Sequence, residues 1–186
     1  RLPQRAELEV RKPLWNLSLN SAGLAIHFYS NAPEIKVRYG VSGPLSMPHM
    51  PNTGVSGIDL YGIDSDGNWM NASGSYQWGD TISYTFTNIG KDKFHNRGFE
   101  YRLYLPLYNT VKWLQVGVPE NTELKFISIR EKKPIVAYGT SITQGACASR
   151  PAMAWTNIVS RTLDYPLINM GFSGNGKLEK EVINYL

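Results

Sequence analysis

Several residue types and segments are scarce in this chain, and each scarcity excludes a class of protein. Cys147 is the only cysteine and there are three histidines, so no internal disulfide can form and no zinc-binding spacing occurs. No apolar run approaches the roughly 18 residues of a membrane span. The first residues lack the apolar core of a secretion signal, so we expect any export signal to have been removed. The net charge of +4 is spread without a basic run, which argues against a nucleic-acid partner.

The chain does contain enough apolar sequence for a large core, with 42% hydrophobic and 12% aromatic residues. From about residue 14 to residue 130, short runs alternate apolar and polar residues, and turn-forming segments rich in Gly, Asn, Asp and Pro separate them. This pattern predicts an antiparallel, jelly-roll-like β-sandwich domain over residues 1–131. The expected strands are LAIHFYS, EIKVRYGV, GIDLYGI, TISYTFT, EYRLYLPLY, WLQVGV and LKFISI.

The pattern changes at residue 132, where the segment PIVAY is continuously apolar, as in parallel strands covered on both faces. Ser149 as N-cap and Pro151 in the first turn predict a helix after it. A second strand, PLINM, and a second helix, KLEKEVINYL, follow. The expected apolar positions are Ala152, Trp155, Val159 and Leu163 in the first helix and Leu178, Val182, Tyr185 and Leu186 in the second.

This order of strand, helix, strand and helix is typical of a doubly wound α/β domain. We therefore expect residues 132–186 to form the first part of a flavodoxin-like domain. Such a fold normally needs on the order of 150 residues, so we expect the domain to continue beyond Leu186.

The most informative motif is GTSITQG at residues 139–145, where a strand leads directly into Ser141. A serine hydroxyl attacks a carbonyl only with a rigid mount, a base and donors for the oxyanion. The motif is not a phosphate loop, because no lysine follows Gly145, and Thr143 occupies the second glycine position of a GxSxG elbow. It resembles the first block of the SGNH (GDSL-type) hydrolases, GDSIT-x-G, with Thr140 in place of the usual aspartate.

A second segment, NMGFSGNG, resembles the second block of the same family, which implies that Gly174 offers its backbone N–H to the oxyanion beside Ser141 N–H. The two blocks lie about 30 residues apart in the expected order, which is more specific than either alone. Considered singly, Ser141 could be an ordinary N-cap or turn serine, and Gly174 could serve a tight turn.

The amino-terminal part resembles the sandwich domain that precedes a bacterial subgroup of this family, because GIDLY at residues 57–61 matches its GxDLY signature. We expect Asp59 in this signature to bond backbone N–H groups rather than to act as an acid. The resemblance implies a serine esterase without cofactor that hydrolyses small acyl esters, acetyl esters of carbohydrates among them. It also implies a periplasmic or secreted bacterial enzyme.

The base that should activate Ser141 is not evident in the sequence. The family's D-x-x-H block does not occur after Gly176, so we expect the catalytic aspartate and histidine beyond Leu186. The D-x-x-H at residues 92–95 precedes Ser141 within a turn-like segment and is not expected to complete a triad. His49, on the loop SMPHMP, is a candidate to overhang the active site.

Two other functions remain open at the level of the sequence. Four tryptophans could stack on sugar rings, although packing within sheets explains them first. A non-catalytic carbohydrate-binding protein with a degenerate hydrolase domain is therefore the alternative, and a structural or interaction domain is a third possibility. The four tryptophans that could stack on sugar rings are Trp15, Trp69, Trp78 and Trp113. The sequence leaves the oligomeric state open.

Overall fold

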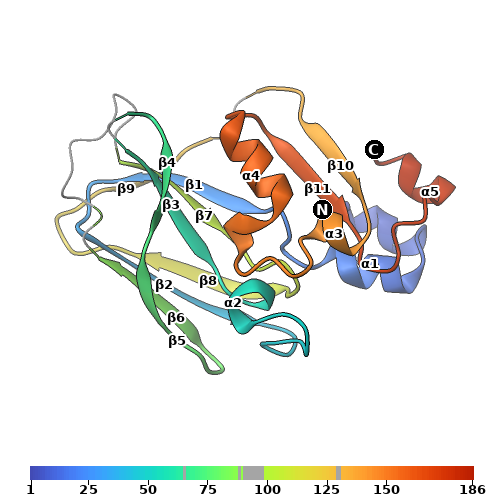
Figure 1. Ribbon diagram of the computed structural model, residues 1–186, viewed down its shortest axis with the longest axis horizontal. Helices are drawn as coiled ribbons and strands as arrows, with labels where there is room; N and C mark the ends of the chain where they lie inside the picture. The colour runs from blue at the N-terminus through green and yellow to red at the C-terminus, as the bar shows by residue number, and fades with distance from the viewer. Residues whose placement is uncertain (65, 88, 90–98, 129–130) are drawn as a thin grey trace.

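The computed structural model describes residues 1–186 except 65, 88, 90–98 and 129–130. Two antiparallel sheets face each other at one end of the molecule, and two parallel strands with several helices lie at the other end (Figure 1).

The antiparallel sheets contain nine of the described strands. The first sheet has the order β4-β3-β7-β1-β9 and the second has the order β5-β6-β2-β8. Their bounds are β1 (Ala25–Ser30), β2 (Glu34–Val41), β3 (Asp59–Ile63), β4 (Trp69–Ala72), β5 (Gly74–Gln77), β6 (Ile82–Thr87), β7 (Glu100–Tyr104), β8 (Val111–Gly117) and β9 (Leu124–Phe126). A short helix, α2 (Asn52–Val55), lies between β2 and β3.

The core between the two sheets consists of the inward-facing apolar residues of both. Phe28 and Leu103 from the first sheet and Val37 and Phe86 from the second belong to one buried cluster. This arrangement confirms the predicted antiparallel sandwich. The strands β4 and β5 were not predicted, because their residues are mostly exposed and carry no clear apolar alternation.

The second half of the structure confirms the predicted order of strand, helix and strand. The strands β10 (Ile135–Gly139) and β11 (Leu167–Gly171) are parallel and in register from Ile135↔Leu167 to Gly139↔Gly171. The helices of this half are α3 (Ser141–Gln144), η2 (Pro151–Met153), α4 (Trp155–Thr162) and α5 (Lys180–Ile183).

Both predicted helices are shorter than expected. Ser149 is not an N-cap; a 3-10 turn at η2 precedes α4, whose N-cap is the extended residue Ala154. The helix therefore turns another face inward, so that Asn157 is buried while Trp155 is exposed. In α5 only Val182 of the predicted apolar positions is buried. The other departures from the predicted stripes are exposed side chains at Leu163, Leu178 and Leu186.

The amino-terminal segment is helical, whereas alternating strands were expected from Leu14 onward. It forms η1 (Gln4–Leu8) and α1 (Lys12–Ser18). Leu14 packs in one buried cluster with Met170, Phe172 and Val182, so α1 covers the parallel strands rather than the sandwich. The helix α1 precedes the sandwich in the sequence, yet it packs against the half of the structure that contains GTSITQG.

The outer face of the five-stranded sheet joins the two halves. Tyr61 and Tyr104 on this face pack with the buried Ala152 of η2. The guanidinium of Arg161 in α4 lies 4.1 Å from the centre of the Tyr61 ring, and Arg102 pairs with Asp164 at 2.5 Å. The cation–π contact therefore holds α4 against the sheet, and the ion pair holds the residues directly after this helix.

Candidate active site

Ser141 lies at the point where β10 ends and α3 begins. The chain passes from Gly139 through Thr140 into Ser141, the first residue of α3, and the C-cap of this helix is Gly145 with φ of 112°. The Ser141 carbonyl oxygen accepts the N–H groups of Gly145 at 3.0 Å and Ala146 at 2.8 Å. A short, hydrogen-bonded turn therefore mounts the serine at the carboxyl end of a parallel strand.

The Ser141 side chain is half-buried, and its hydroxyl makes no hydrogen bond within the part of the chain that the structure describes. No base among the described residues therefore holds its proton. A serine nucleophile needs such a base, so the described residues supply the mount but not the activating histidine.

Gly174 lies in the loop that follows β11, with φ of 67° and open space where a Cβ would stand. This loop is held against the end of β10, because Phe172 N–H donates to Gly139 O at 2.9 Å. At Gly176 an added Cβ would lie 2.1 Å from the same oxygen, so the close approach requires glycine there.

The backbone N–H groups of Ser141 and Gly174 have no acceptor among the described residues. Their neighbours in the same loop are engaged: Ser173 N–H donates to Gln144 Oε1 at 2.9 Å, and Asn175 N–H donates to Phe172 O at 2.8 Å. Two unengaged donors on adjoining turns are what an oxyanion hole requires. The structure thus leaves available the two N–H groups that the sequence predicts as donors.

Two buried amide side chains, Gln144 and Asn169, join these turns and were not singled out from the sequence. Gln144 is fully buried and also donates to Leu107 O at 3.2 Å. Asn169 donates to Thr143 O at 2.7 Å and accepts Gly171 N–H at 2.9 Å. The sequence did contain an indication for Asn169, because a polar residue inside the apolar strand PLINM needs hydrogen-bond partners.

Tyr108, from the connection between β7 and β8, reaches the same site. Its hydroxyl donates to the Ser141 carbonyl oxygen at 3.2 Å and also interacts with the Ser173 side chain. Burial raises the pKa of the Tyr108 hydroxyl, so it remains a donor at neutral pH. The sandwich half thus contributes a side chain that joins the serine turn to the Gly174 loop. No sequence signal pointed to Tyr108, because 33 residues separate it from Ser141.

His49 is exposed on the loop between β2 and α2. Together with Tyr108, Ser173 and Asn175 it lines a depression of about 520 Å³ beside the two turns. The structure therefore places His49 near the candidate site, and its carbonyl oxygen faces Cys147 Sγ at 3.7 Å. A catalytic role for its imidazole stays a prediction.

The other candidate groups do not join this site. His27 lies in β1, and the D-x-x-H at residues 92–95 falls outside the described residues. Within the described ranges, no group of three or more His, Cys, Asp or Glu side chains is arranged to hold a metal ion. No described helix has both the length and the apolar character that crossing a bilayer requires.

Asp59 of the GIDLY segment has the structural role that the sequence predicts. It is 5% exposed, and its Oδ2 accepts Ala152 N–H at 2.8 Å, which ties β3 to η2. Arg150 lies 3.7 Å from Oδ1. Burial raises the pKa of the Asp59 carboxyl to about 6, although Ala152, Arg150 and Arg161 oppose this change.

The raised pKa of Asp59 predicts a specific pH dependence of stability. The folded pKa of about 6 exceeds the ordinary aspartate pKa of 3.8, so the protonated carboxyl stabilises the fold below about pH 4 and this contribution is lost as the pH rises through 6. The loss amounts to about 3 kcal/mol. The Asp59→Asn variant keeps an oxygen for Ala152 N–H and should gain that much relative to wild type between pH 4 and pH 7, measured by urea unfolding of the complete polypeptide.

Asp80→Asn, at an exposed aspartate, is the matched control and should show no such gain. A stability difference between wild type and Asp59→Asn that stays constant from pH 4 to pH 7 would contradict the prediction.

Comparisons with known proteins agree with this geometry. Residues 1–124 match the family model described as GxDLY, the N-terminus of the SGNH hydrolase-type esterases, and residues 132–186 match the GDSL-like lipase/acylhydrolase family. A search of the curated proteins finds no match.

Two solved structures are similar to the chain. One is a candidate GDSL-like lipase from Bacteroides ovatus ATCC 8483, with 39% identity, a TM-score of 0.87 and coverage of 98% of this chain and 52% of that one. The other is the salicylyl-acyltransferase SsfX3 from a tetracycline biosynthetic pathway, with 18% identity, a TM-score of 0.65 and coverage of 98% and 49%. The second likeness shows the fold alone, and the chain spans about half the length of both structures.

The amino-terminal match covers most of the chain, and the GDSL-like match begins directly before β10. The chain therefore belongs to the SGNH (GDSL-like) lipase and acylhydrolase family, in the group that carries a GxDLY-type N-terminal domain.

Proposed function

We propose that the protein is a serine ester hydrolase that cleaves small acyl esters, acetyl esters of carbohydrates in particular, with Ser141 as its nucleophile. In this proposal residues 1–131 are the amino-terminal domain, whose strands form the sandwich and whose helix α1 packs on the second domain, and residues 132–186 begin a flavodoxin-like catalytic domain. The carbohydrate substrate follows from the family resemblance, which also suggests a periplasmic or secreted enzyme.

The reaction would proceed in two acyl transfers. Ser141 Oγ adds to the ester carbonyl while a histidine takes its proton, and the resulting oxyanion accepts hydrogen bonds from Ser141 N–H and Gly174 N–H. The tetrahedral intermediate collapses to an acyl-serine, and the histidine returns the proton to the departing alcohol. Water then attacks the acyl-serine by the same route and releases the carboxylic acid.

The observation that carries the proposal is the pair of unengaged N–H groups beside an unengaged serine hydroxyl. Gly174 is exposed and Ser141 is half-buried, so water can occupy both donors until the oxygen of an ester displaces it. Removing one oxyanion donor typically costs about 3 kcal/mol of transition-state stabilisation, so their placement bears directly on rate.

The test is covalent labelling of the complete polypeptide with a fluorophosphonate, which reacts with activated serines. We expect one label per chain, located at Ser141 by peptide mass spectrometry, and loss of 4-nitrophenyl acetate hydrolysis in proportion to labelling. A label at another residue, or hydrolysis that survives full labelling, would overturn the assignment. Absence of both labelling and hydrolysis would favour the carbohydrate-binding alternative.

A further inference from the structure

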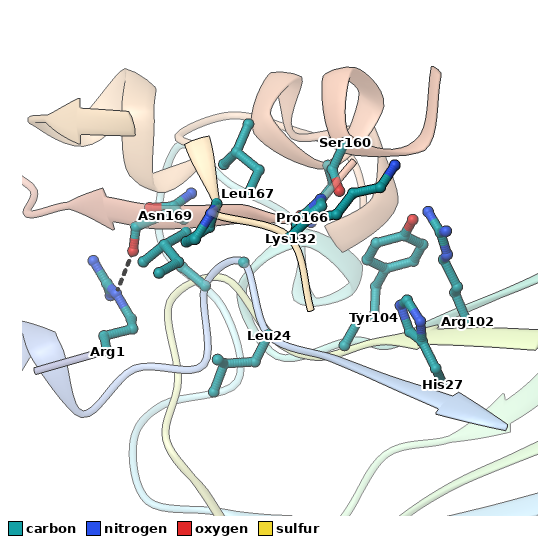
Figure 2. A pocket seen from close by; sticks show the side chains of 16 residues that line it. Arg1, Leu24, His27, Arg102, Tyr104, Lys132, Ser160, Pro166, Leu167 and Asn169 are labelled. Carbon is teal, nitrogen blue, oxygen red and sulfur yellow. Dashed lines mark hydrogen bonds between the residues drawn. The ribbon is translucent and has the colours of Figure 1, made fainter. Parts of the chain in front are cut away.

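A cavity of about 450 Å³ separates the outer face of the five-stranded sheet from the parallel strands. Figure 2 shows its two sides: His27, Arg102 and Tyr104 come from β1 and β7, and Lys132, Ser160 and Pro166 come from the facing half. Neither Ser141 nor Gly174 lines it. Its volume is in the range of sites for small organic ligands, which often form where two parts of a chain meet.

The polar lining of this cavity is basic. His27 and Arg102 are directly opposite each other in the antiparallel pairing of β1 with β7, and Tyr104 follows on the same face of β7. Lys132 makes no ion pair within the described part of the chain, although its Nζ lies 5.0 Å from the centre of the Tyr165 ring. No aspartate or glutamate is among the lining residues. Arg102 is already paired with Asp164 at 2.5 Å, so the attraction for a negatively charged group comes from Lys132.

Two polar atoms in the wall have no hydrogen-bond partner among the described residues: Arg102 Nε and Tyr104 Oη. Both side chains are more than nine-tenths buried, because Arg102 is 6% and Tyr104 is 3% exposed. An arginine Nε can only donate, and a tyrosine hydroxyl has a proton to donate. Leaving such donors unsatisfied costs about 1 to 3 kcal/mol each. Each of the two atoms has less than 1 Å² of accessible surface, so an acceptor on a ligand reaches them only when the Arg102 or Tyr104 side chain turns toward the cavity.

The remainder of the lining is largely apolar. Leu24 comes from the sandwich half, and Pro134, Pro166, Leu167 and Ile168 come from the parallel strands and the turns before them. A doubly charged ligand would be costly to desolvate against this surface. A single carboxylate on an apolar body would pair with Lys132 and match the apolar wall.

We propose that this cavity is a second ligand site, separate from the candidate active site, that binds a monocarboxylate with an apolar body. The carboxylate lies between Lys132 and the Arg102–Tyr104 wall, and the apolar body contacts Leu24 and Leu167. Because such a ligand contacts both halves of the chain, it stabilises their packing as its concentration rises above its dissociation constant.

The probe is 4-phenylbutyrate, with 4-phenylbutanamide as its uncharged isostere, titrated calorimetrically into the complete polypeptide. We expect saturable binding of the carboxylate and at least tenfold weaker binding of the amide. The thermal unfolding temperature should rise with the carboxylate and not with the amide. Equal affinity for the two compounds, or no saturation at about 10 mM, would overturn the proposal.

Adjacent lysines provide the matched variants. Lys132 lines the cavity and Lys133 does not, and both are exposed. Lys132→Met should weaken carboxylate binding about tenfold, whereas Lys133→Met should leave it within about twofold, since only the first removes a charge at the site. Equal losses of carboxylate affinity in both variants would show a general effect of net charge and would contradict the proposed site.

A final arm separates this cavity from the active site. Protein labelled at its reactive serine with a fluorophosphonate should bind 4-phenylbutyrate as tightly as unlabelled protein. Loss of binding on labelling would place the carboxylate at the active site and overturn the proposal, while leaving the proposed hydrolase function intact.

Discussion

The Ser141→Ala variant of the complete polypeptide is expected to hydrolyse 4-nitrophenyl acetate with a kcat lowered by about 10⁴- to 10⁶-fold, the usual effect of removing a serine nucleophile. We expect this loss of activity to come from the missing nucleophile and not from a less stable fold. The Ser141 hydroxyl has no hydrogen-bond partner among the described residues, so its removal breaks no structural contact. The midpoint of urea unfolding should therefore stay within about 0.5 kcal/mol of wild type.

Ser149→Ala is the matched control, because Ser149 is exposed and contributes only its backbone oxygen, which accepts Thr53 Oγ1–H at 2.6 Å. Its kcat should equal that of wild type. A Ser141→Ala variant that retains turnover would show that another group attacks the ester. A variant that loses activity and stability together would show that the hydroxyl has a structural partner.

The parts of the site that the sequence predicts are those determined by local chain geometry. An apolar strand, a glycine-flanked turn and a short helix lie within 135–145, so the mount of Ser141 follows from neighbouring residues. The same holds for Gly174, whose positive φ is a property of a single glycine. The sandwich was likewise predictable, because alternation with a period of two reports burial on one face of a sheet.

The supporting contacts were not predictable in this way, because they connect distant segments. Tyr108 comes from the sandwich half, and the α1 helix precedes the sandwich yet packs on β11. A single sequence gives the apolarity of Leu14 but not the surface that buries it. The interruption of the predicted helix at Ala154 also depends on a distant residue. The buried Asp59 carboxyl of β3 accepts the Ala152 N–H and so holds the η2 turn separate from α4.

Two glycines three residues apart, Gly171 and Gly174, provide a matched pair of variants that tests how closely β11 packs on α3. Gly171 ends β11, and a Cβ there would lie 2.1 Å from Gln144 N and 2.5 Å from Thr143 C. Both are backbone atoms of α3, so no side-chain rotation relieves the contact. Gly171→Ala should therefore lower the free energy of unfolding by about 3 kcal/mol, at the upper end of ordinary overpacking.

Gly174→Ala meets no atom within 4 Å and keeps its N–H donor, so only the positive φ of 67° opposes it, at about 1 kcal/mol. Urea unfolding should show a difference of about 2 kcal/mol between the free energies of unfolding of the two variants.

The two variants should also differ in kcat, because α3 carries Ser141. Displacing α3 should lower kcat more for Gly171→Ala than for Gly174→Ala, since a misplacement of about 1 Å can cost about 100-fold. Equal stabilities would mean that β11 and α3 are not in the close contact that holds the serine turn beside the Gly174 loop. A larger kcat loss for Gly174→Ala at unchanged stability would mean instead that the orientation of its N–H, and not the mount of Ser141, limits the rate.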